Sequence, residues 1–410
     1  MHTSNITMTK RLKTCKMLKK NFIKHPTLII FSYLDFPFYT GLSRRIEGLI
    51  NQLSFYDIRS IIISPISRLH SPIPLSLPNT HVIRVDLRKI FLQLIQIKIV
   101  KLIVLMFFSL HALILLIKLK SRYDLPNILQ YESIYSFIPA FLSKVFLNMK
   151  IIGDDLIFLK RTPLPQKILY ALILKNTDYI VVSNLPSYKK LTAEFPYKQI
   201  LFTPNGVFKE KIDFSKKRLN QLIFVGILTY KENIEAVKSI VELVQMMGHR
   251  IKYDILLIGG PQQALRKMKK QANKKIKFLG YLEEKRYKRI LRSAFIGLLP
   301  FFRENEWGGQ RIKTLEFLSH GLLTISTLQG VRGIRGLKPD KHYLQFSNLE
   351  ELNNLLQTIS DNPKAYMNIA REGQRFVAEK YHWRRVTESY IRLIISLLDN
   401  ESPHKSPRLN

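Results

Sequence analysis

Short apolar runs separated by longer amphipathic segments recur along the first half of the chain. They lie at residues 27–33, 58–64, 127–131, 150–153 and 178–183. Each run has the length of a buried strand, and the segments between the runs are long enough for helices. Because strands that alternate with helices form parallel sheets with crossover helices, we predict an α/β domain over residues 27–203.

A second series of apolar runs follows Pro204, at residues 222–226, 253–259, 276–280, 295–300 and 322–327. We predict a second α/β domain over residues 204–380. The boundary falls where Pro204, Asn205 and Gly206 interrupt the apolar pattern. Open parallel sheets bind ligands beyond the carboxyl ends of their strands. Two such domains that face each other would therefore hold a ligand in the cleft between them.

Composition and charge narrow the function classes. The chain has 410 residues, of which 46% are hydrophobic and 23% charged, which excludes a disordered tail and a small disulfide-stapled module. The 65 Lys and Arg residues outnumber 30 Asp and Glu residues, for a net charge of +35. This excess indicates an anionic partner, such as a nucleotide, a phospholipid surface or nucleic acid. Cys15 is the single cysteine, so an internal disulfide and a thiolate zinc cluster are excluded.

The two ends of the chain are expected to lie outside the domains. Residues 1–26 form a basic arm, because seven Lys and Arg residues and no acidic residue lie between Lys10 and Lys24. No apolar segment follows the arm in the order of a signal peptide, so we expect a cytoplasmic protein. Residues 398–410 are expected to form a tail.

The most apolar stretch, residues 102–117, is bounded by Lys101 and Lys118. It is short for a membrane span, which needs about 20 apolar residues. A buried helix of the first domain is the favoured interpretation. A third interpretation is a helix over residues 84–122 that lies among the headgroups of an anionic membrane, because lysines and arginines alternate with its apolar residues. Peripheral membrane attachment stays open, and a span is disfavoured.

The segment 307–321 carries the most informative chemistry. It begins with Gly308 and Gly309 and continues with a helical pattern whose first turn holds Arg311 and Lys313. Cations beside the free N–H groups of a helix N-terminus are suited to a diphosphate. Glu316 follows within one turn, and a carboxylate there can accept two ribose hydroxyls. The alternative is a plain surface ion pair between Lys313 and Glu316.

Two glycines follow predicted strands at the same kind of position. Gly41 precedes a helix that begins near Arg44 and Arg45, and Gly259 ends the run at 253–259. A glycine lets a phosphate or a neighbouring backbone approach closely. The alternative for each is a tight turn between strand and helix.

Taken together, a set of short segments resembles the group 1 retaining glycosyltransferases of the GT-B fold. The segments are GLSRRIEGL at 41–49, VVSN at 181–184, TPNGV at 203–207, FVGILTYKEN at 224–233, LLIGG at 256–260, KFLGYL at 277–282, GGQRIKTLEFLSHG at 308–321 and YHW at 381–383. The resemblance implies two Rossmann-like, doubly wound domains that face each other across a cleft. It also implies a nucleotide-sugar donor on the second domain, an acceptor on the first, and a final helix, over residues 381–397, that crosses back to the first domain.

The resemblance also assigns roles to residues on the donor side. Glu316 matches the carboxylate that holds the donor ribose, and Gly41 and Gly259 match backbone positions near the donor phosphates. Many members carry a glutamate where this chain has Gly308, and an arginine where it has Ile227. Lys231 is an approximate match for a lysine of the family. We therefore expect Arg311 and Lys313 to take over part of the diphosphate binding.

In the first domain, Glu132 stands where many members have a histidine, and it is our candidate for the reaction centre. Asp154 and Asp155 match a commonly acidic stretch, and we expect the two, Asp155 above all, to orient the acceptor hydroxyl. The alternative for both sites is an N-cap or loop carboxylate. No Asp-x-Asp metal motif is present in a suitable context, so we predict no essential metal and no cofactor besides the nucleotide-sugar co-substrate.

The sequence thus predicts a transferase that moves a sugar from a UDP- or GDP-sugar to a glycan or a lipid-linked acceptor, with retention. Two alternatives remain: a sugar-nucleotide epimerase, and a membrane-docked GT-B-like protein without catalysis. Nucleic acid is not expected as a partner, because the basic residues are dispersed among apolar strands and helices rather than gathered on a recognition element.

Overall fold

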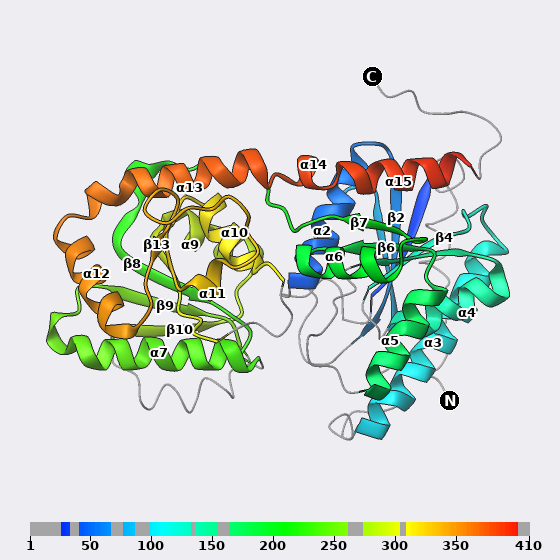
Figure 1. Cartoon of the computed structure of the whole chain (residues 1–410), viewed down its shortest axis with the longest axis horizontal. Helices are drawn as coiled ribbons and strands as arrows, with labels where there is room; N and C mark the ends of the chain where they lie inside the picture. The colour runs from blue at the N-terminus through cyan, green and yellow to red at the C-terminus, as the bar shows by residue number, and fades with distance from the viewer. Residues whose placement is uncertain are drawn as a thin grey trace, which may run out of the picture.

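The computed structural model describes residues 26–32, 41–66, 77–86, 98–132, 136–154, 164–228, 230–260, 274–303 and 309–400. These residues form two α/β domains that lie side by side along the longest axis of the molecule (Figure 1). Each domain is built on its own parallel sheet, of seven strands in the first and six in the second. The prediction of two Rossmann-like domains is confirmed.

The first sheet has the strand order β3-β2-β1-β4-β5-β6-β7, and its neighbouring strands pair in parallel. Its strands are β1 (Thr27–Phe31), β2 (Arg59–Ile66), β3 (Thr80–Asp86), β4 (Ile128–Glu132), β5 (Lys150–Asp154), β6 (Tyr179–Val182) and β7 (Gln199–Phe202). The direction of strand order reverses between β1 and β4, which is where such sheets open a crevice for ligands at their carboxyl ends.

Helices cover both faces of the first sheet. They are α2 (Gly41–Ser54), α3 (Lys98–Lys120), α4 (Phe137–Leu147), α5 (Leu164–Asn176) and α6 (Leu185–Glu194). Side chains of β1 alternate between the two faces, as a strand demands. Ile29 and Phe31 pack in one core with residues of α3, α4, α5 and α6. Leu28 and Ile30 pack in the other core with residues of α2.

The second sheet has the order β10-β9-β8-β11-β12-β13, again with parallel pairs. Its strands are β8 (Arg218–Val225), β9 (Asp254–Ile258), β10 (Ile276–Gly280), β11 (Ala294–Leu299), β12 (Leu323–Ser326) and β13 (Leu344–Gln345). Its helices are α7 (Lys231–Met247), α9 (Glu284–Ser293), α10 (Ile312–Ser319), α11 (Leu328–Val331), α12 (Leu349–Asp361) and α13 (Met367–Lys380), with 3₁₀ turns at Phe214–Lys216, Gly248–Arg250 and Pro363–Tyr366. Here the order reverses between β8 and β11.

The chain returns to the first domain after α13, as expected. The return consists of two helices, α14 (Trp383–Val386) and α15 (Glu388–Asp399), so it extends two residues beyond the predicted end at 397. Trp383 fills the space above Gly48 and Gly206, where a Cβ would lie 2.1 and 2.7 Å from its ring. Tyr390 and Ile394 are fully buried in the same core as α2. Figure 1 shows α14 bridging the two domains and α15 lying along the first.

The strands that the apolar runs predict are all present, and three further strands are not predicted. These three are β3, β7 and β13. Four successive residues of β3, from His81 to Arg84, are only half-buried, because β3 is the edge strand of its sheet. A half-buried edge strand carries polar residues, so it lacks the continuous apolar run by which buried strands are recognised.

The interpretation of residues 84–122 as one helix is wrong. Arg84 belongs to the strand β3, and the helix α3 begins only at Lys98. Phe108, Ala112, Leu116 and Leu119 of α3 are buried in the first domain, so the favoured interpretation of a core helix is confirmed. None of the helices in the described parts of the chain has both the length and the apolar character needed to cross a bilayer.

Candidate functional site

The N-terminus of α10 lies at the carboxyl edge of the second sheet, next to the reversal of strand order between β8 and β11. Arg311 is the N-cap residue of α10, rather than part of its first turn as predicted, and Lys313 lies in that turn. Neither Arg311 nor any other side chain caps the helix in the described structure. Because the N–H groups of a first turn have no partners within the helix, this end of α10 is suited to an anion.

Lys313 is a half-buried cation, and none of the carboxylates in the described parts of the chain forms an ion pair with it. Its Nζ donates a hydrogen bond of 2.7 Å to Oδ1 of Asn233, near the start of α7. The same Nζ lies 5.1 and 5.0 Å from the ring centroids of Phe224 and Phe301. Burial, with a smaller contribution from the charge of Arg311, lowers the pKa of Lys313 to about 7. An anionic ligand would stabilise the charged form.

Arg311 is the second cation of this cluster. Its guanidinium lies 3.8 Å from the centroid of the Phe301 ring, and Nε donates a hydrogen bond to the carbonyl of Gln329. Nη2 is buried and has no hydrogen-bond partner among the described residues. Burial lowers the pKa of Arg311 to about 10. Two repelling cations at a helix N-terminus are costly by themselves, so this arrangement indicates an anion between them.

Glu316 lies one turn further along α10. One carboxylate oxygen accepts a hydrogen bond of 3.0 Å from the Tyr287 hydroxyl of α9, and the other lies 3.5 Å from Nε of Arg44. Burial raises the pKa of Glu316, and Arg44 opposes that rise more than any other group. The Glu316 side chain is 19% exposed, so hydroxyl groups of a ligand can reach its carboxylate.

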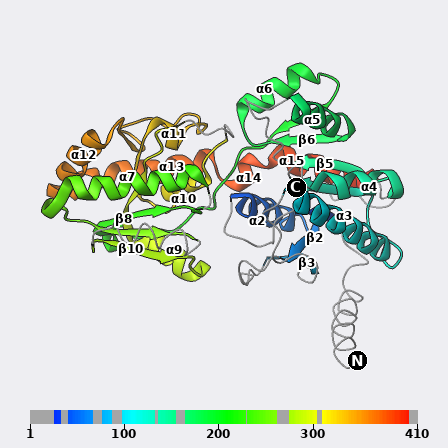
Figure 2. The same cartoon turned by 90° about the horizontal axis from the view of Figure 1, so that it is seen from below.

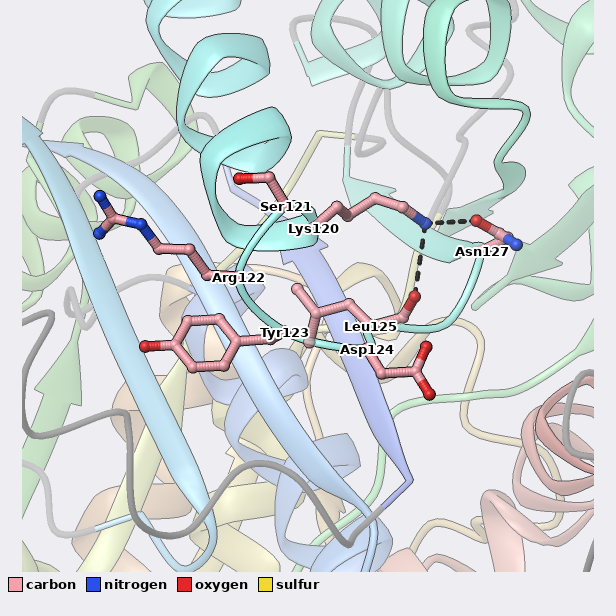
Figure 3. A pocket seen from close by; sticks show the side chains of 7 residues that line it. All are labelled: Lys120, Ser121, Arg122, Tyr123, Asp124, Leu125 and Asn127. Carbon is pink, nitrogen blue, oxygen red and sulfur yellow. Dashed lines mark hydrogen bonds between the residues drawn. The ribbon is translucent and has the colours of Figure 1, made fainter.

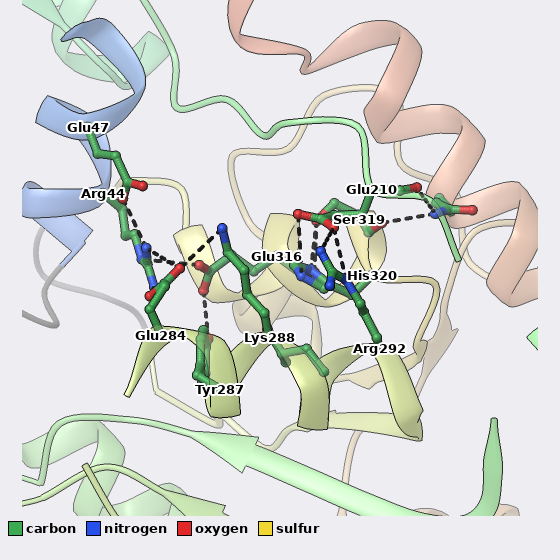
Figure 4. A network of polar contacts seen from close by, with 12 residues as sticks. Arg44, Glu47, Glu210, Glu284, Tyr287, Lys288, Arg292, Glu316, Ser319 and His320 are labelled. Carbon is green, nitrogen blue, oxygen red and sulfur yellow. Dashed lines mark hydrogen bonds and ion pairs between the residues drawn. The ribbon is translucent and has the colours of Figure 1, made fainter. Parts of the chain in front are cut away.

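Arg44 reaches Glu316 from the other domain. It lies in the first turn of α2 and makes a bidentate ion pair with Glu284 of α9, at 3.0 and 2.6 Å (Figure 4). A third carboxylate, that of Glu47, lies 2.9 Å away. Burial alone would lower the pKa of Arg44, but Glu316, Glu284 and Glu47 together raise it well above its ordinary value. Sequence reasoning placed Arg44 at a helix start but did not find this pairing, because its partner lies 240 residues away.

The two glycines that were predicted to lie near the donor phosphates, Gly41 and Gly259, are both closely packed. A Cβ on Gly41 would lie 3.3 Å from Ile312, so the first residue of α2 faces the first residue of α10 across the domain boundary. Gly259 has φ +131°, and a Cβ there would lie 1.9 Å from the carbonyl oxygen of Gly226. The close approach of these two backbones accounts for Gly259. A contact of either glycine with a phosphate stays a prediction.

Lys231 is the first residue of α7 and is exposed. It precedes Asn233 by two residues, and Asn233 also donates a hydrogen bond of 2.8 Å to the carbonyl of Ile227. The starts of α7 and α10 therefore meet at one edge of the second sheet. The structure thus gathers Arg311, Lys313 and Glu316 on one short helix whose first residue contacts Gly41, and Lys231 stands at the start of the neighbouring helix α7.

The first-domain candidates lie at the carboxyl edge of the first sheet. Glu132 ends β4 and is fully buried, opposite Asp154 at the end of β5. Asp154 is held by Arg45, whose Nη2 lies 2.7 Å and whose Nε lies 3.0 Å from its oxygens. The Asp154 carboxylate is therefore committed to a buried ion pair. Asp155 lies outside the described residues, as does Gly308.

The same buried pair is connected to the donor side. Arg45 donates from Nη1 to the carbonyl of Thr203 and to Oδ1 of Asn205, in the segment between the domains. The backbone N–H of Asn205 donates to Oε1 of Gln310, and the Gln310 amide donates to the carbonyl of Gly333. Gln310 therefore ties the loop before α10 to the interdomain segment, a role that no local sequence signal indicates.

A separate cavity of about 410 Å³ lies at the end of α3, between Lys120 and Asn127 (Figure 3). Lys120 donates to the Asn127 side chain and to the carbonyl of Leu125. The cavity precedes the first residue of β4, so it lies at the amino edge of the sheet, opposite to the edge that carries Glu132. It is not part of the site at the domain boundary.

In the parts of the chain that the structure describes, no group of three His, Cys, Asp or Glu side chains is placed to hold a metal ion. The expectation that the reaction needs no metal and no further cofactor stays a prediction.

Comparisons with known proteins bear on the fold and on the family that the second domain resembles. Residues 220–359 match the family model of the glycosyl transferases of group 1. A search of curated protein sequences found no match. Among solved structures, sucrose-phosphate synthase from Thermosynechococcus elongatus is similar with a TM-score of 0.69 at 13% identity, over 92% of this chain and 100% of that one.

Two further solved structures cover the full length of their own chains. A glycosyltransferase from Rickettsia africae has a TM-score of 0.62 at 12% identity, over 92% of this chain. HepE from Anabaena, in complex with UDP-glucose, has a TM-score of 0.59 at 10% identity, over 91% of this chain. At these identities the likeness concerns the fold. The chain therefore has the two-domain GT-B fold, and residues 220–359 of its second domain match the family model of the group 1 glycosyl transferases.

Proposed function

We infer that this protein transfers a sugar from a UDP- or GDP-sugar to an acceptor hydroxyl, with retention of the anomeric configuration. The observation that carries the inference is the cluster at the start of α10. Lys313 and Arg311 lie half-buried beside each other, neither is paired with a carboxylate among the described residues, and Glu316 lies one turn away. This spacing of two cations and one hydroxyl acceptor suits the diphosphate and ribose of a nucleotide sugar.

The proposed reaction makes a specific demand on these cations. The bond between the anomeric carbon and the β-phosphate oxygen breaks, and that oxygen keeps the electron pair. A new bond forms from the acceptor oxygen to the anomeric carbon, and the hydroxyl proton leaves with the products. Negative charge therefore grows on the diphosphate in the transition state, where fixed cations in a water-poor cleft stabilise it most.

The stereochemistry, the donor, the acceptor and the location are each supported by a different observation. Retention rests on the resemblance to the retaining enzymes of group 1. A UDP-sugar donor is supported by the relative HepE, whose solved structure contains UDP-glucose. A glycan or lipid-linked acceptor would bind on the first domain, beside Glu132. A single cysteine in 410 residues fits a protein of the reducing cytoplasm.

Thermal shift against UDP and GDP tests donor binding, because a ligand that binds only the folded state raises the melting temperature. We expect one of the two nucleotides to stabilise the protein. Glu316→Gln should weaken that shift, whereas Glu350→Gln, at an exposed glutamate of α12, serves as the matched control. A protein that responds to neither nucleotide would refute the proposal.

The alternatives give different outcomes with a labelled nucleotide sugar and a membrane extract. A transferase moves the label into a larger product only when acceptor is present. An epimerase changes the sugar of the donor without acceptor, and a protein without catalysis does neither. Release of UDP with an inverted product would overturn retention alone.

A further inference from the structure

The helices α3, α4 and α5 expose an unusual amount of apolar surface. They cover the face of the first sheet that is opposite to α2 and α15, and Figures 1 and 2 show all three on the first domain. We call their exposed apolar side chains the outer apolar face; they are Met106, Phe107, Leu110, Ile114, Ile117, Val145, Phe146, Ile168, Leu169 and Leu172. Single exposed apolar residues are ordinary, but a gathering of ten on adjoining helices indicates an interaction surface.

The helix α3 has two apolar stripes with the same helical spacing. Phe108, Ala112, Leu116 and Leu119 point into the core of the first domain. Met106, Leu110, Ile114 and Ile117 are offset from them by two residues and are 42 to 59% exposed. Two residues correspond to about 200° of helical rotation, so the second stripe lies on the opposite side of α3. The core explains only the first stripe.

The three helices of the outer apolar face carry positive charges only, although Lys144 of α4 pairs with Asp178, just beyond the end of α5. The helix α3 contains four lysines, α4 one and α5 two, and none of the three contains an aspartate or a glutamate. Lys118 and Lys175 are exposed at the ends of α3 and α5. Apolar side chains next to lysines suit the headgroup region of an anionic bilayer, where the apolar groups enter the acyl boundary and the cations meet phosphate. A second copy of this chain is a poor partner, because the same lysines would face each other.

We propose that the outer apolar face docks the protein onto an anionic lipid bilayer, with α3 lying in the headgroup plane. The inward stripe of α3 is packed against the sheet, so the helix lies on the bilayer and does not cross it. At 23 residues α3 is about 34 Å long, about twice the length of the strand β4 that follows it.

Flotation of the full chain with lipid vesicles tests the proposal. The probes are vesicles of phosphatidylcholine alone and vesicles of phosphatidylcholine and phosphatidylglycerol mixed about two to one. We expect flotation with the anionic vesicles and little with the neutral ones. The double variant Leu110→Gln, Ile114→Gln should lower the partition coefficient by roughly tenfold or more, because both side chains leave the acyl boundary.

A matched control tests whether the loss of flotation is specific to the outer apolar face or follows from the loss of any two exposed apolar side chains. The double variant Met246→Gln, Leu328→Gln changes two side chains of similar exposure on the second domain, and it should float like the unchanged protein. The melting temperature of each variant, and its shift with UDP, establish that the fold is kept. The flotation test does not depend on the transferase activity, so the two proposals fail separately.

Three results would overturn the docking proposal. The first is that the unchanged protein stays in the soluble fraction when it is mixed with anionic vesicles. The second is equal flotation of the α3 variant and the unchanged protein, which would assign binding to other basic segments, such as the arm at residues 10–24. The third is a concentration-dependent dimer, measured by light scattering, that the α3 variant abolishes, because it would make a second copy the occupant of this face.

Discussion

Arg44→Gln is the sharpest test of how the first domain acts on the donor site. Arg44 opposes the burial that raises the pKa of Glu316, so its removal should raise that pKa further. A protonated carboxyl accepts ribose hydroxyls less well than a carboxylate. We therefore expect Arg44→Gln to weaken UDP binding most at low pH and least at high pH, where Glu316 ionises again.

The size of the effect follows from the geometry. Nε of Arg44 lies 3.5 Å from the Glu316 carboxylate, a distance at which two unit charges attract by about 5 kcal/mol at an effective dielectric constant of about 20. Both side chains keep 19% of their surface exposed, and the charges lose hydration on burial. The charged form of Glu316 is therefore expected to lose a net stabilisation of about 1.5 kcal/mol, which corresponds to UDP binding weakened by up to about tenfold at the low end of the pH range.

The ratio of the UDP affinities of the unchanged protein and Arg44→Gln is measured by calorimetric titration. The titrations run between about pH 6 and pH 9, in steps of about one pH unit. Arg292→Gln is the matched control, since Arg292 pairs with Glu210 of the same domain at 2.8 Å and does not contact Glu316. A ratio of one at every pH would refute the role of Arg44. A tenfold loss that does not vary with pH would show that Arg44 acts by holding the domains together and not by keeping Glu316 charged.

Further predictions concern the packing and the charge of the site. Gly259→Ala should lower the free energy of unfolding by at least about 2 kcal/mol, because the added Cβ would meet a carbonyl oxygen. The control is Gly248→Ala, whose Cβ would meet nothing within 4 Å and which should cost about 1 kcal/mol. Unfolding in urea measures both changes. Arg45→Leu should destabilise the fold by about 3–5 kcal/mol, because the buried Asp154 carboxylate would lose its ion pair. Arg392→Leu is the control, because Arg392 and Glu388 form an exposed pair whose loss should cost under about 1 kcal/mol. UDP binding should weaken as pH rises through about 7, where Lys313 loses its charge in the free protein, and Lys313→Met should bind UDP weakly without this dependence.

Local sequence signals were sufficient for the buried strands and for one side of the site, but not for β3, β7 and β13. The strands β1 and β11 are buried along their whole length, so each leaves a continuous apolar run that can be recognised without knowledge of its neighbours. Arg311, Lys313 and Glu316 share two turns of one helix, so their spacing alone predicts that they act together.

Contacts between distant segments could not be predicted in the same way. Arg44 and Glu284 meet because α2 and α9 lie on facing edges of two domains, and nothing in either local sequence encodes that distance. The roles of Asp154 and Gln310 likewise depend on the interdomain segment at Thr203 and Asn205. The outer stripe of α3 was visible as apolar residues, but only packing of the opposite stripe into the core shows which residues are left for a partner. Periodicity is a property of neighbours along the chain, whereas pairing of charges and exposure of a face are set by which elements the fold brings together.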